Sequence, residues 1–190
     1  MKRKMAVDFG AVLVLIAGLA ATAWSVPLTF EARAGLLRPN SGGARDAYGT
    51  GPVFGIDITI PVWKQLGLWA GADYYRKKGH LTYTLEDTTL RVVPLYAGLK
   101  LQSAASRLKP YAALGAGLFS YKETNVLGSA SGSKIGVVAQ AGVLAHIKGP
   151  LSVDAHARYT SVRVTAGEGT DAETVDLGGL QAGLGLAVSF

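Results

Sequence analysis

Apolar side chains recur at every second position along most of the chain. Between residues 66 and 75, Leu, Ala and Tyr at the even positions alternate with Gly, Trp, Asp and Tyr at the odd positions. The same period of two runs through residues 92–101 and 135–147. Successive side chains of a strand point to opposite faces, so this period predicts β-strands. Helical spacing is not sustained anywhere after the first 23 residues.

Eight alternating segments follow one another and are joined by connections of two kinds. The expected strands are residues 28–38, 51–62, 66–77, 89–102, 109–121, 134–147, 151–163 and 174–190. The connections after the odd-numbered strands are long, polar and rich in glycine: residues 38–51, 77–88, 122–134 and 165–174. Those after the second and sixth strands, residues 62–65 and 148–150, are tight, and the fourth connection, residues 103–109, is intermediate. The tip of the second long connection is expected at either residues 77–80 or residues 85–88.

This arrangement predicts an all-β fold, an eight-stranded antiparallel transmembrane β-barrel. An even number of strands of about ten residues, with short turns at one end and long loops at the other, is typical of such barrels. A soluble β-sandwich also alternates, but its connections have no reason to sort by parity and its outer face should be polar. Here the second face carries mainly glycine and aromatic residues, with a few isolated charges. Tiny and bulky side chains of this kind fill the inside of a narrow barrel, while the apolar face contacts lipid.

The first residues have a different character. Residues 2–4 are basic, residues 9–21 are apolar, and Ala21 and Ala23 have the spacing that a signal peptidase recognises. A membrane-anchoring helix would need about 20 apolar residues, more than this stretch offers. We therefore predict a cleaved signal peptide over residues 1–23 and an outer-membrane barrel domain over residues 24–190, with cleavage after Ser25 as an alternative.

Composition changes this interpretation little. The chain of 190 residues has no cysteine, which excludes disulfides and thiolate metal sites. The net charge is +6, and the leader holds three positive charges and one negative, which leaves +4 on the mature chain. This excess fits contact with anionic lipid or sugar phosphates and is too small and dispersed to indicate nucleic acid. After the leader, no apolar stretch is long enough for a transmembrane helix.

Three segments resemble the small outer-membrane β-barrel proteins of the OmpA/OmpX/OmpW-like group. They are "RVVPLYAGLKL" (residues 91–101), "RLKPYAALGAGLFSY" (residues 107–121) and the terminal "GLGLAVSF" (residues 183–190). The resemblance implies a location in the outer membrane of a Gram-negative-type envelope. It also implies that an aromatic last residue, preceded by alternating apolar residues, is read by the barrel-assembly machinery. The residues that match this assembly signal are Phe190, Val188, Leu186 and Leu184.

Seven charged residues fall on the inward face by alternation. They are Glu31, Arg33, Asp57, Asp73, Lys100, Asp154 and Arg158. Ionised groups removed from bulk water must be paired, because isolated burial is costly. By position along the strands, Arg33 and Asp57 should be level on neighbouring strands, and Asp73 and Arg158 level across the lumen. We expect these charges to help fill the lumen.

A basic cluster marks the loop ends of two strands. Arg76, Lys77 and Lys78 are followed by His80, and Arg91 begins the next strand, while Arg45 lies in the first loop. The phosphates of lipopolysaccharide are the expected counterpart of a basic rim at an anionic bilayer surface, and contacts are expected at Arg76, Lys77, Lys78 and Arg91. The alternative is a set of solvated loop charges.

Motifs for catalysis or cofactors are not found. The sequence lacks G-x-G-x-x-G, P-loop, G-x-S-x-G and H-E-x-x-H motifs, and its three histidines are scattered. A lipid A deacylase-like site should show His-x-Ser-Asn, but the nearest candidates, His156 and Ser161, are five apart and point to opposite faces. We therefore predict no enzyme, metal or cofactor, and a monomeric structural or surface-interaction barrel. The alternatives are a narrow channel for small or hydrophobic molecules and an outer-membrane lipid-modifying enzyme.

Overall fold

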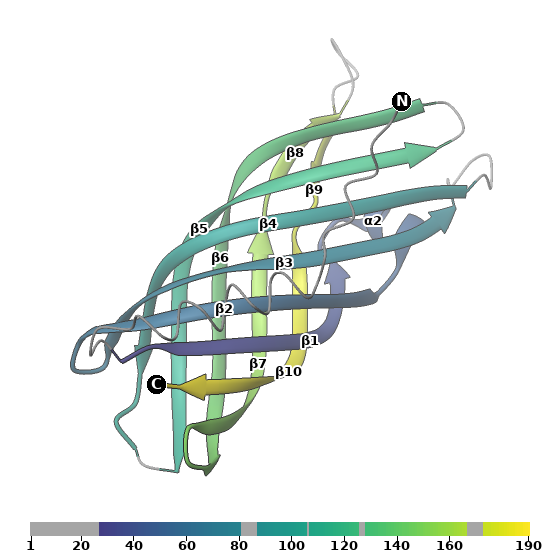
Figure 1. The fold of residues 1–190 in the computed structure, drawn as a ribbon. Coiled ribbons are helices and arrows are strands. Elements are labelled where there is room, and N and C mark those ends of the chain that lie inside the picture. The colour runs from purple at the N-terminus through teal and green to yellow at the C-terminus, as the bar shows by residue number, and fades with distance from the viewer. Residues whose placement is uncertain (1–26, 81–86, 106, 126–127, 167–172) are drawn as a thin grey trace, which may run out of the picture.

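Eight antiparallel strands close into a barrel, as the alternation predicts (Figure 1). The computed structural model describes residues 27–80, 87–105, 107–125, 128–166 and 173–190. The barrel strands are β1 (Thr29–Pro39), β2 (Gly51–Trp63), β3 (Leu66–His80), β4 (Asp87–Gln102), β5 (Leu108–Asn125), β6 (Gly128–Lys148), β7 (Leu151–Ser161) and β10 (Gly179–Ser189). Neighbours in the wall follow chain order except where β10 lies between β7 and β1. The predicted signal peptide, residues 1–23, lies outside the described residues.

The last strand closes the wall against the first. β10 and β1 pair from Thr29 with Ser189 to Pro39 with Gly179. The Phe190 amide donates to the Leu28 carbonyl at 2.8 Å, and the Leu28 amide donates back to Phe190 at 3.3 Å. Every backbone group of a strand in lipid needs a partner, so this seam is what removes the two sheet edges.

The two ends of the barrel differ, and we name them by their connections. The turn end holds the tight turn at Lys64 and Gln65, where Lys64 has φ 43°, and the turn at Gly149, where φ is 58°. The loop end holds the long connections, one of which contains the short helix α2 (Gly42–Tyr48) and another the strands β8 (Arg163–Ala166) and β9 (Glu173–Asp176). Figure 1 shows β3 to β6 extending past the shorter strands at this end.

The helix α2 corrects the expectation of a wholly irregular first loop. Ala44 and Tyr48, four residues apart, form its buried face. A helix of seven residues shows only two such positions, too few for the spacing to stand out from a polar, glycine-rich background.

The final predicted strand, residues 174–190, is also corrected, because it is two strands. β9 leaves the wall to pair with β8 in a separate two-stranded sheet, and β10 begins only at Gly179. The carboxylate of Asp176 holds the break: Oδ1 accepts the Val162 amide at 2.9 Å and the Gly178 amide at 2.8 Å. A side chain placed at this junction therefore competes with strand pairing, which alternation alone does not reveal.

Two loops are shorter than expected because their strands continue past the predicted ends. β5 and β6 pair as far as Asn125 with Gly128, so most of residues 122–134 is strand. Residues 77–80 pair with residues 87–90, so the tip of the second connection does not lie at residues 77–80. Residues 85–86 of the other candidate tip lie outside the described part of the chain. The hairpin of β5 and β6 is rich in serine and glycine, so its composition resembles that of a loop although its residues are paired as strands.

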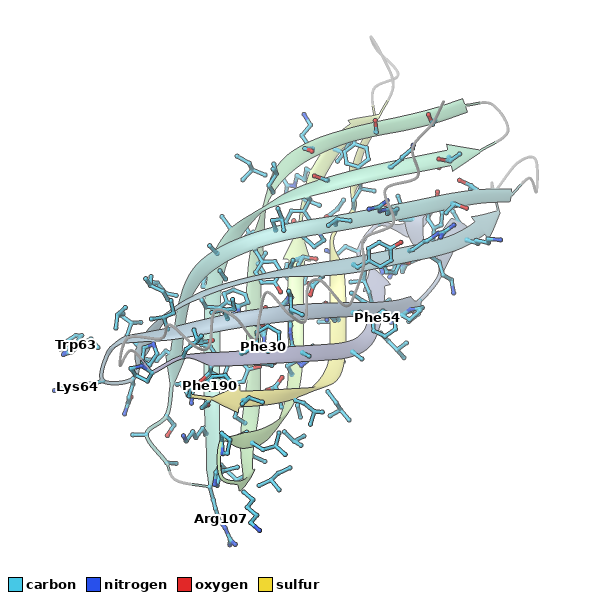
Figure 2. The ribbon with its side chains drawn as sticks, in the orientation of Figure 1. Phe30, Phe54, Trp63, Lys64, Arg107 and Phe190 are labelled. Atoms are coloured by element: carbon cyan, nitrogen blue, oxygen red, sulfur yellow. The ribbon has the colours of Figure 1, made fainter. Side chains whose placement is uncertain are left out.

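Alternation correctly assigned the two faces of the wall. Trp69, Tyr75 and Phe119 point inward and are 1%, 2% and 3% exposed, whereas Leu99 and Leu184 point outward and are 50% and 64% exposed. Exposed aromatic side chains lie near both ends of the outer face, with Trp63 and Phe190 at the turn end and Phe54 towards the loop end (Figure 2). The core is therefore the lumen itself. Among the described residues, no helix has the length and hydrophobicity to cross a membrane.

Candidate functional site

Four charged side chains form a closed ring in the middle of the lumen. Arg33 of β1 and Arg158 of β7 each contact both Asp57 of β2 and Asp73 of β3. All four residues are at most 5% exposed. The sequence predicted the pairs Arg33–Asp57 and Asp73–Arg158, and the structure brings both pairs together, but as parts of one ring. We call these four residues the lumen ring.

The two arginines use several donors on the ring. Arg33 donates through Nη2 to Asp57 Oδ1 and Asp73 Oδ1, both at 3.0 Å. Arg158 donates through Nη1 to Asp73 Oδ2 at 2.5 Å and through Nη2 to Asp57 Oδ2 at 3.2 Å. Each aspartate thus uses one oxygen for each arginine. Charge-assisted hydrogen bonds of this kind offset the cost of removing the ions from water.

Two uncharged side chains, Tyr96 and Gln140, complete the ring and were not singled out as its members from the sequence. The Tyr96 hydroxyl accepts from Arg33 at 2.6 Å and from Arg158 at 2.5 Å, and it donates to Asp57 at 2.6 Å. The Gln140 carbonyl oxygen accepts from Arg158 Nε at 2.9 Å, and its amide donates to the Tyr111 hydroxyl at 2.7 Å. Their inward parity is the signal that could have identified them. The Arg158 guanidinium also lies 4.3 Å from the Tyr96 ring centroid, at cation–π distance.

Glycines make the space that the ring occupies. A Cβ at Gly71 would collide with the Asp57 carboxylate, and one at Gly55 would collide with the Asp73 carboxylate. Both glycines face inward on the strands beside the two aspartates. The mixture of tiny and bulky inward residues read from the sequence therefore serves the packing of the charged groups.

A second group of polar residues lies between the ring and the turn end. It comprises Glu31, Asp154 and His156, whose ligand-type atoms all lie within 4.8 Å of one another. Lys100 approaches it, with Nζ 3.7 Å from Glu31 Oε2 and 4.0 Å from the Tyr111 ring centroid. His156 Nδ1 is 2.7 Å from Asp154 Oδ2. We call Glu31, Asp154 and His156 the acidic cluster. The sequence does not reveal this cluster, because Glu31 lies on β1 and is far from Asp154 and His156 along the chain.

The loop end of the lumen is covered by α2. Tyr48 inserts over the apolar layer above the ring and donates to Glu123 Oε1 at 2.7 Å, beside Thr88 Oγ1 at 3.1 Å. Burial raises the pKa of the Tyr48 hydroxyl, so the hydroxyl stays a hydrogen-bond donor further into alkaline pH than a free tyrosine does. The helix is thus held to the inside of β4 and β5 by its one aromatic side chain.

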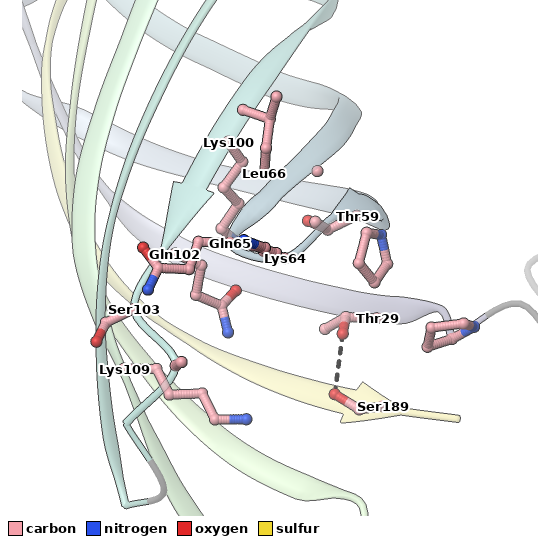
Figure 3. Close-up of a pocket in the computed structure, with 14 residues that line it drawn as sticks. Thr29, Thr59, Lys64, Gln65, Leu66, Lys100, Gln102, Ser103, Lys109 and Ser189 are labelled. Carbon is pink, nitrogen blue, oxygen red and sulfur yellow. Dashed lines mark hydrogen bonds between the residues drawn. The ribbon is translucent and has the colours of Figure 1, made fainter.

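Cavities approach the ring from both ends. A cavity of about 20 Å³ lies on the loop side, next to Asp73 and Tyr75, which is room for about one water molecule. A pocket of about 300 Å³ opens at the turn end and includes Lys100 (Figure 3). Two further lysines, Lys64 and Lys109, line its mouth. The ring and the cluster separate these two spaces.

The predicted basic rim divides between the two faces of the wall. Arg76 of β3 is level with Arg91 of β4, which is level with Lys122 of β5, and all three are exposed on the outer face. Lys78, two residues beyond Arg76, is exposed on that same face. Lys77 has the opposite parity, is partly buried and donates to the Thr50 carbonyl at 3.0 Å, so it lies apart from the other three predicted contacts. Lys122 was not among the predicted contacts because it falls in the predicted loop of residues 122–134. We call Arg76, Arg91 and Lys122 the cationic row.

The residues considered for lipid hydrolysis do not assemble. His156 is buried in the lumen, while Ser161 donates its hydroxyl to Asp176 at 3.0 Å. His80 and Asp87 are the loop residues that a palmitoyltransferase-like site could use. Their backbones are level on β3 and β4, but their side chains lie outside the described part of the structure.

Comparisons with known proteins agree with this architecture. The family model described as outer membrane protein beta-barrel domain matches residues 9–187. Neisserial surface protein A (NspA) is 21% identical, with 86% of this chain and 96% of that chain covered and a TM-score of 0.52. OprG from Pseudomonas aeruginosa is 13% identical, with 87% and 96% covered and a TM-score of 0.65. AlkL, solved in lipid bilayers, is 15% identical, with 100% and 97% covered and a TM-score of 0.56.

These likenesses between structures show the fold alone, since the sequences are so different. No curated protein sequence matches the chain. The family match spans nearly the whole barrel, and the barrel carries an apolar outer face and a polar, filled lumen. The chain belongs to the outer membrane protein β-barrel domain family.

Proposed function

We propose that this outer-membrane barrel is sealed to ions and that its work is done at the surface of the membrane. The lumen ring is the observation that carries the proposal. Its four charged groups are joined through Tyr96 and Gln140 across the lumen, which leaves the barrel axis blocked by side chains held by charge-assisted hydrogen bonds. An eight-stranded barrel has an interior just wide enough for such side chains. The same filling supports a structural, non-catalytic role.

The surface role that we propose is binding of lipopolysaccharide phosphates by the cationic row. Short turns of outer-membrane barrels face the periplasm, so the loop end, where the row lies, faces outward. Like charges directly opposite on neighbouring strands repel one another, and Arg76, Arg91 and Lys122 are three in succession. Bound phosphates would remove that repulsion. The Arg91 guanidinium also lies 5.4 Å from the ring centroid of Tyr74, which orients it on the outer wall.

The surface role is tested with purified, refolded barrel and lipopolysaccharide in mixed micelles. The variant Arg91→Gln, at the centre of the row, should weaken binding several-fold, and removal of the lipid A phosphates should abolish the difference. Arg107→Gln is the matched control, because Arg107 is an exposed cation at the turn end (Figure 2). Equal losses in both variants would show that binding follows net charge and would contradict the proposal.

A location in the outer membrane also requires export and assembly of the barrel. We infer that residues 1–23 direct export and are removed, that the barrel-assembly machinery recognises Phe190 and the alternating residues before it, and that the folded protein is a monomer. Mass spectrometry of the protein extracted from outer membranes should find a chain that begins at Trp24. A chain that still begins at Met1 would contradict the cleavage.

One observation favours a second candidate, a narrow conduit for hydrophobic molecules. A hollow of about 510 Å³ opens in the lipid-facing wall beside Ile60, Leu68 and Gly98, and Trp69 also lines it. Trp69 packs against Tyr96 with their ring centroids 4.9 Å apart, so passage into the lumen would need the indole to move. Uptake of an apolar fluorescent probe by vesicles that contain the barrel, abolished when the outward-facing Ala97 of the same hollow is replaced by Leu, would favour the conduit over the sealed barrel.

A further inference from the structure

The acidic cluster contains buried polar atoms that the protein leaves unsatisfied. Glu31 is 1% exposed, and its carboxylate oxygens meet Arg33 Nε and Lys100 Nζ only at 3.7 Å each, without a hydrogen bond to any described residue. Asp154 Oδ1 and His156 Nε2 are likewise without partners in the described part of the chain, and both residues are at most 6% exposed. Buried carboxylates of native proteins are nearly always hydrogen-bonded or bound to a metal, because their desolvation is costly. The Glu31 carboxylate in particular therefore lacks a hydrogen-bonded partner, which a bound cation would supply.

The three side chains have the composition of a metal site. Two carboxylates and an imidazole from β1 and β7 place their ligand-type atoms within 4.8 Å of one another. Zinc binds these ligands at about 2.0–2.2 Å, which separates two ligands of one tetrahedral ion by a little over 3 Å. His156 Nδ1 and Asp154 Oδ2, at 2.7 Å, are already this close, and the proton between them would be replaced by the ion. Glu31 lies within 4.8 Å of the other two ligand atoms and has to approach them to complete the site.

The charges of the lumen indicate the charge of the missing partner. Among the described buried residues, four carboxylates face two arginines and Lys100. The two arginines of the lumen ring balance its two aspartates, and although Arg33 Nε also lies 3.7 Å from Glu31 Oε1, the excess negative charge lies at the acidic cluster. Lys100 is its only lysine partner within the described lumen, and its ammonium lies 3.7 Å from Glu31 without a hydrogen bond. If the Lys100 side chain turns into the turn-end pocket that it also lines, two negative charges remain, which is the charge that one divalent cation neutralises.

We propose that Glu31, Asp154 and His156 bind one divalent cation of the zinc class, which enters from the turn end and displaces the Lys100 ammonium. Mixed oxygen and nitrogen ligands favour Zn²⁺ and its borderline neighbours over Ca²⁺ or Mg²⁺, which prefer oxygen alone. Entry passes through the pocket shown in Figure 3, whose mouth holds Lys64 and Lys109. These lysines repel cations, so association should speed up when salt screens them. The cation lies on the turn-end side of the lumen ring, so the site leaves the sealed barrel intact.

The test titrates Zn²⁺ into the refolded mature barrel after removal of metals by a chelator, with a chromophoric chelator as competitor. The sequence has three histidines, so the background variant His80→Gln/His146→Gln keeps only His156. In this background we expect one Zn²⁺ per chain and a Co²⁺ complex with visible absorption bands of low-coordinate geometry. Glu31→Gln and Asp154→Asn should each weaken binding by about tenfold or more, because each removes a charged ligand and the loss of even an outer-shell partner costs about tenfold. Lys100→Met should tighten binding, because it removes the competing charge.

Each outcome decides the proposal. Loss of Zn²⁺ binding in the His80→Gln/His146→Gln background would assign binding to His80 or His146 and overturn the proposal, as would unchanged affinity in Glu31→Gln. Folding of each carboxylate variant is checked by its heat-dependent migration. If those variants fold poorly, Lys100→Met decides the question, because tighter binding cannot arise from damage to the fold. Unchanged or weaker binding in Lys100→Met would overturn the displacement. Lipopolysaccharide binding should be unaffected throughout, so the two proposals fail separately.

Discussion

At the scale of single residues, the absence of a side chain is as important as its presence. Gly71 faces the lumen where the Asp57 carboxylate and the Tyr96 hydroxyl meet. Gly71→Leu should lower the free energy of unfolding by about 1–3 kcal/mol from overpacking alone, and by more if it displaces Asp57 from its arginines. Gly43→Ala is the control, because no atom lies within 4 Å of a Cβ placed there. Urea unfolding followed by tryptophan fluorescence measures both, and a Gly71 variant as stable as the control would contradict the packing described.

The outer face obeys the opposite rule, since a residue there must be compatible with lipid. Leu184 is 64% exposed on the outside of β10. Leu184→Arg should cost about 2–4 kcal/mol of folding free energy if it lies at the bilayer midplane, and Leu184→Phe should cost little. Reversible unfolding in phospholipid vesicles gives both values. If Leu184→Arg left the folding free energy unchanged, the assignment of Leu184 to the lipid-facing side of β10 would be wrong.

At the scale of elements, the seam between β10 and β1 is the last contact of a closed wall. Phe190 exchanges two backbone hydrogen bonds with Leu28 and carries the expected assembly signal. Deletion of Phe190 should reduce the yield of heat-modifiable barrel in outer membranes far more than deletion of Ala105, which is exposed in a connection at the same end. A deletion within residues 41–46 is a poor control, because it would rotate Tyr48 of α2 away from Glu123. Similar yields after the two deletions would show that Phe190 has no special role in assembly.

At the scale of the whole molecule, the lumen ring joins strands from opposite sides of the barrel. Asp73→Asn or Arg158→Gln alone leaves an unpaired buried charge and should cost about 3–5 kcal/mol. The double variant keeps Arg33 paired with Asp57 at 3.0 Å and should therefore recover part of the loss. The double-mutant cycle measures this coupling, expected at about 0.5–3 kcal/mol. A cycle between Asp73 and Lys100, which make no ion pair with each other in the described structure, should be close to additive and serves as control. Full additivity in the first cycle would rule out the coupling.

The sealed lumen makes a prediction for transport. Planar-bilayer recordings of the wild type should show no stable open level, because the ring and the acidic cluster occupy the axis. The Asp73→Asn/Arg158→Gln variant retains the volume of the ring with weaker bonds and should show brief openings at most. A steady large conductance of the wild type would overturn the plug and favour a channel.

Much of this molecule was predictable because the information is local. A period of two assigns each side chain to a face without knowledge of the neighbouring strands, so the strands, the lipid-facing band and the inward charges were all identifiable. The same rule, applied to the last position of the expected strand 66–77, places Lys77 inward with the other odd-numbered residues. The period of two could not locate α2, the break at Asp176 or the third member of the cationic row, Lys122. These features lie in a short helix, at a junction held by a side chain and in a polar hairpin, none of which has apolar alternation.

Only the tertiary structure decided which inward residues meet. Glu31 and His156 belong to β1 and β7, which are far apart in the sequence and separated by β10 in the wall. Their approach depends on the register of two seams, where Asp154 is level with Gly185 and Gly185 with Arg33. Register is set by hydrogen bonds between strands and by closure of the whole cylinder, so no segment of the chain contains it. The sequence by itself therefore determined which residues face the lumen, while the closed barrel decided that they form one ring and one cluster.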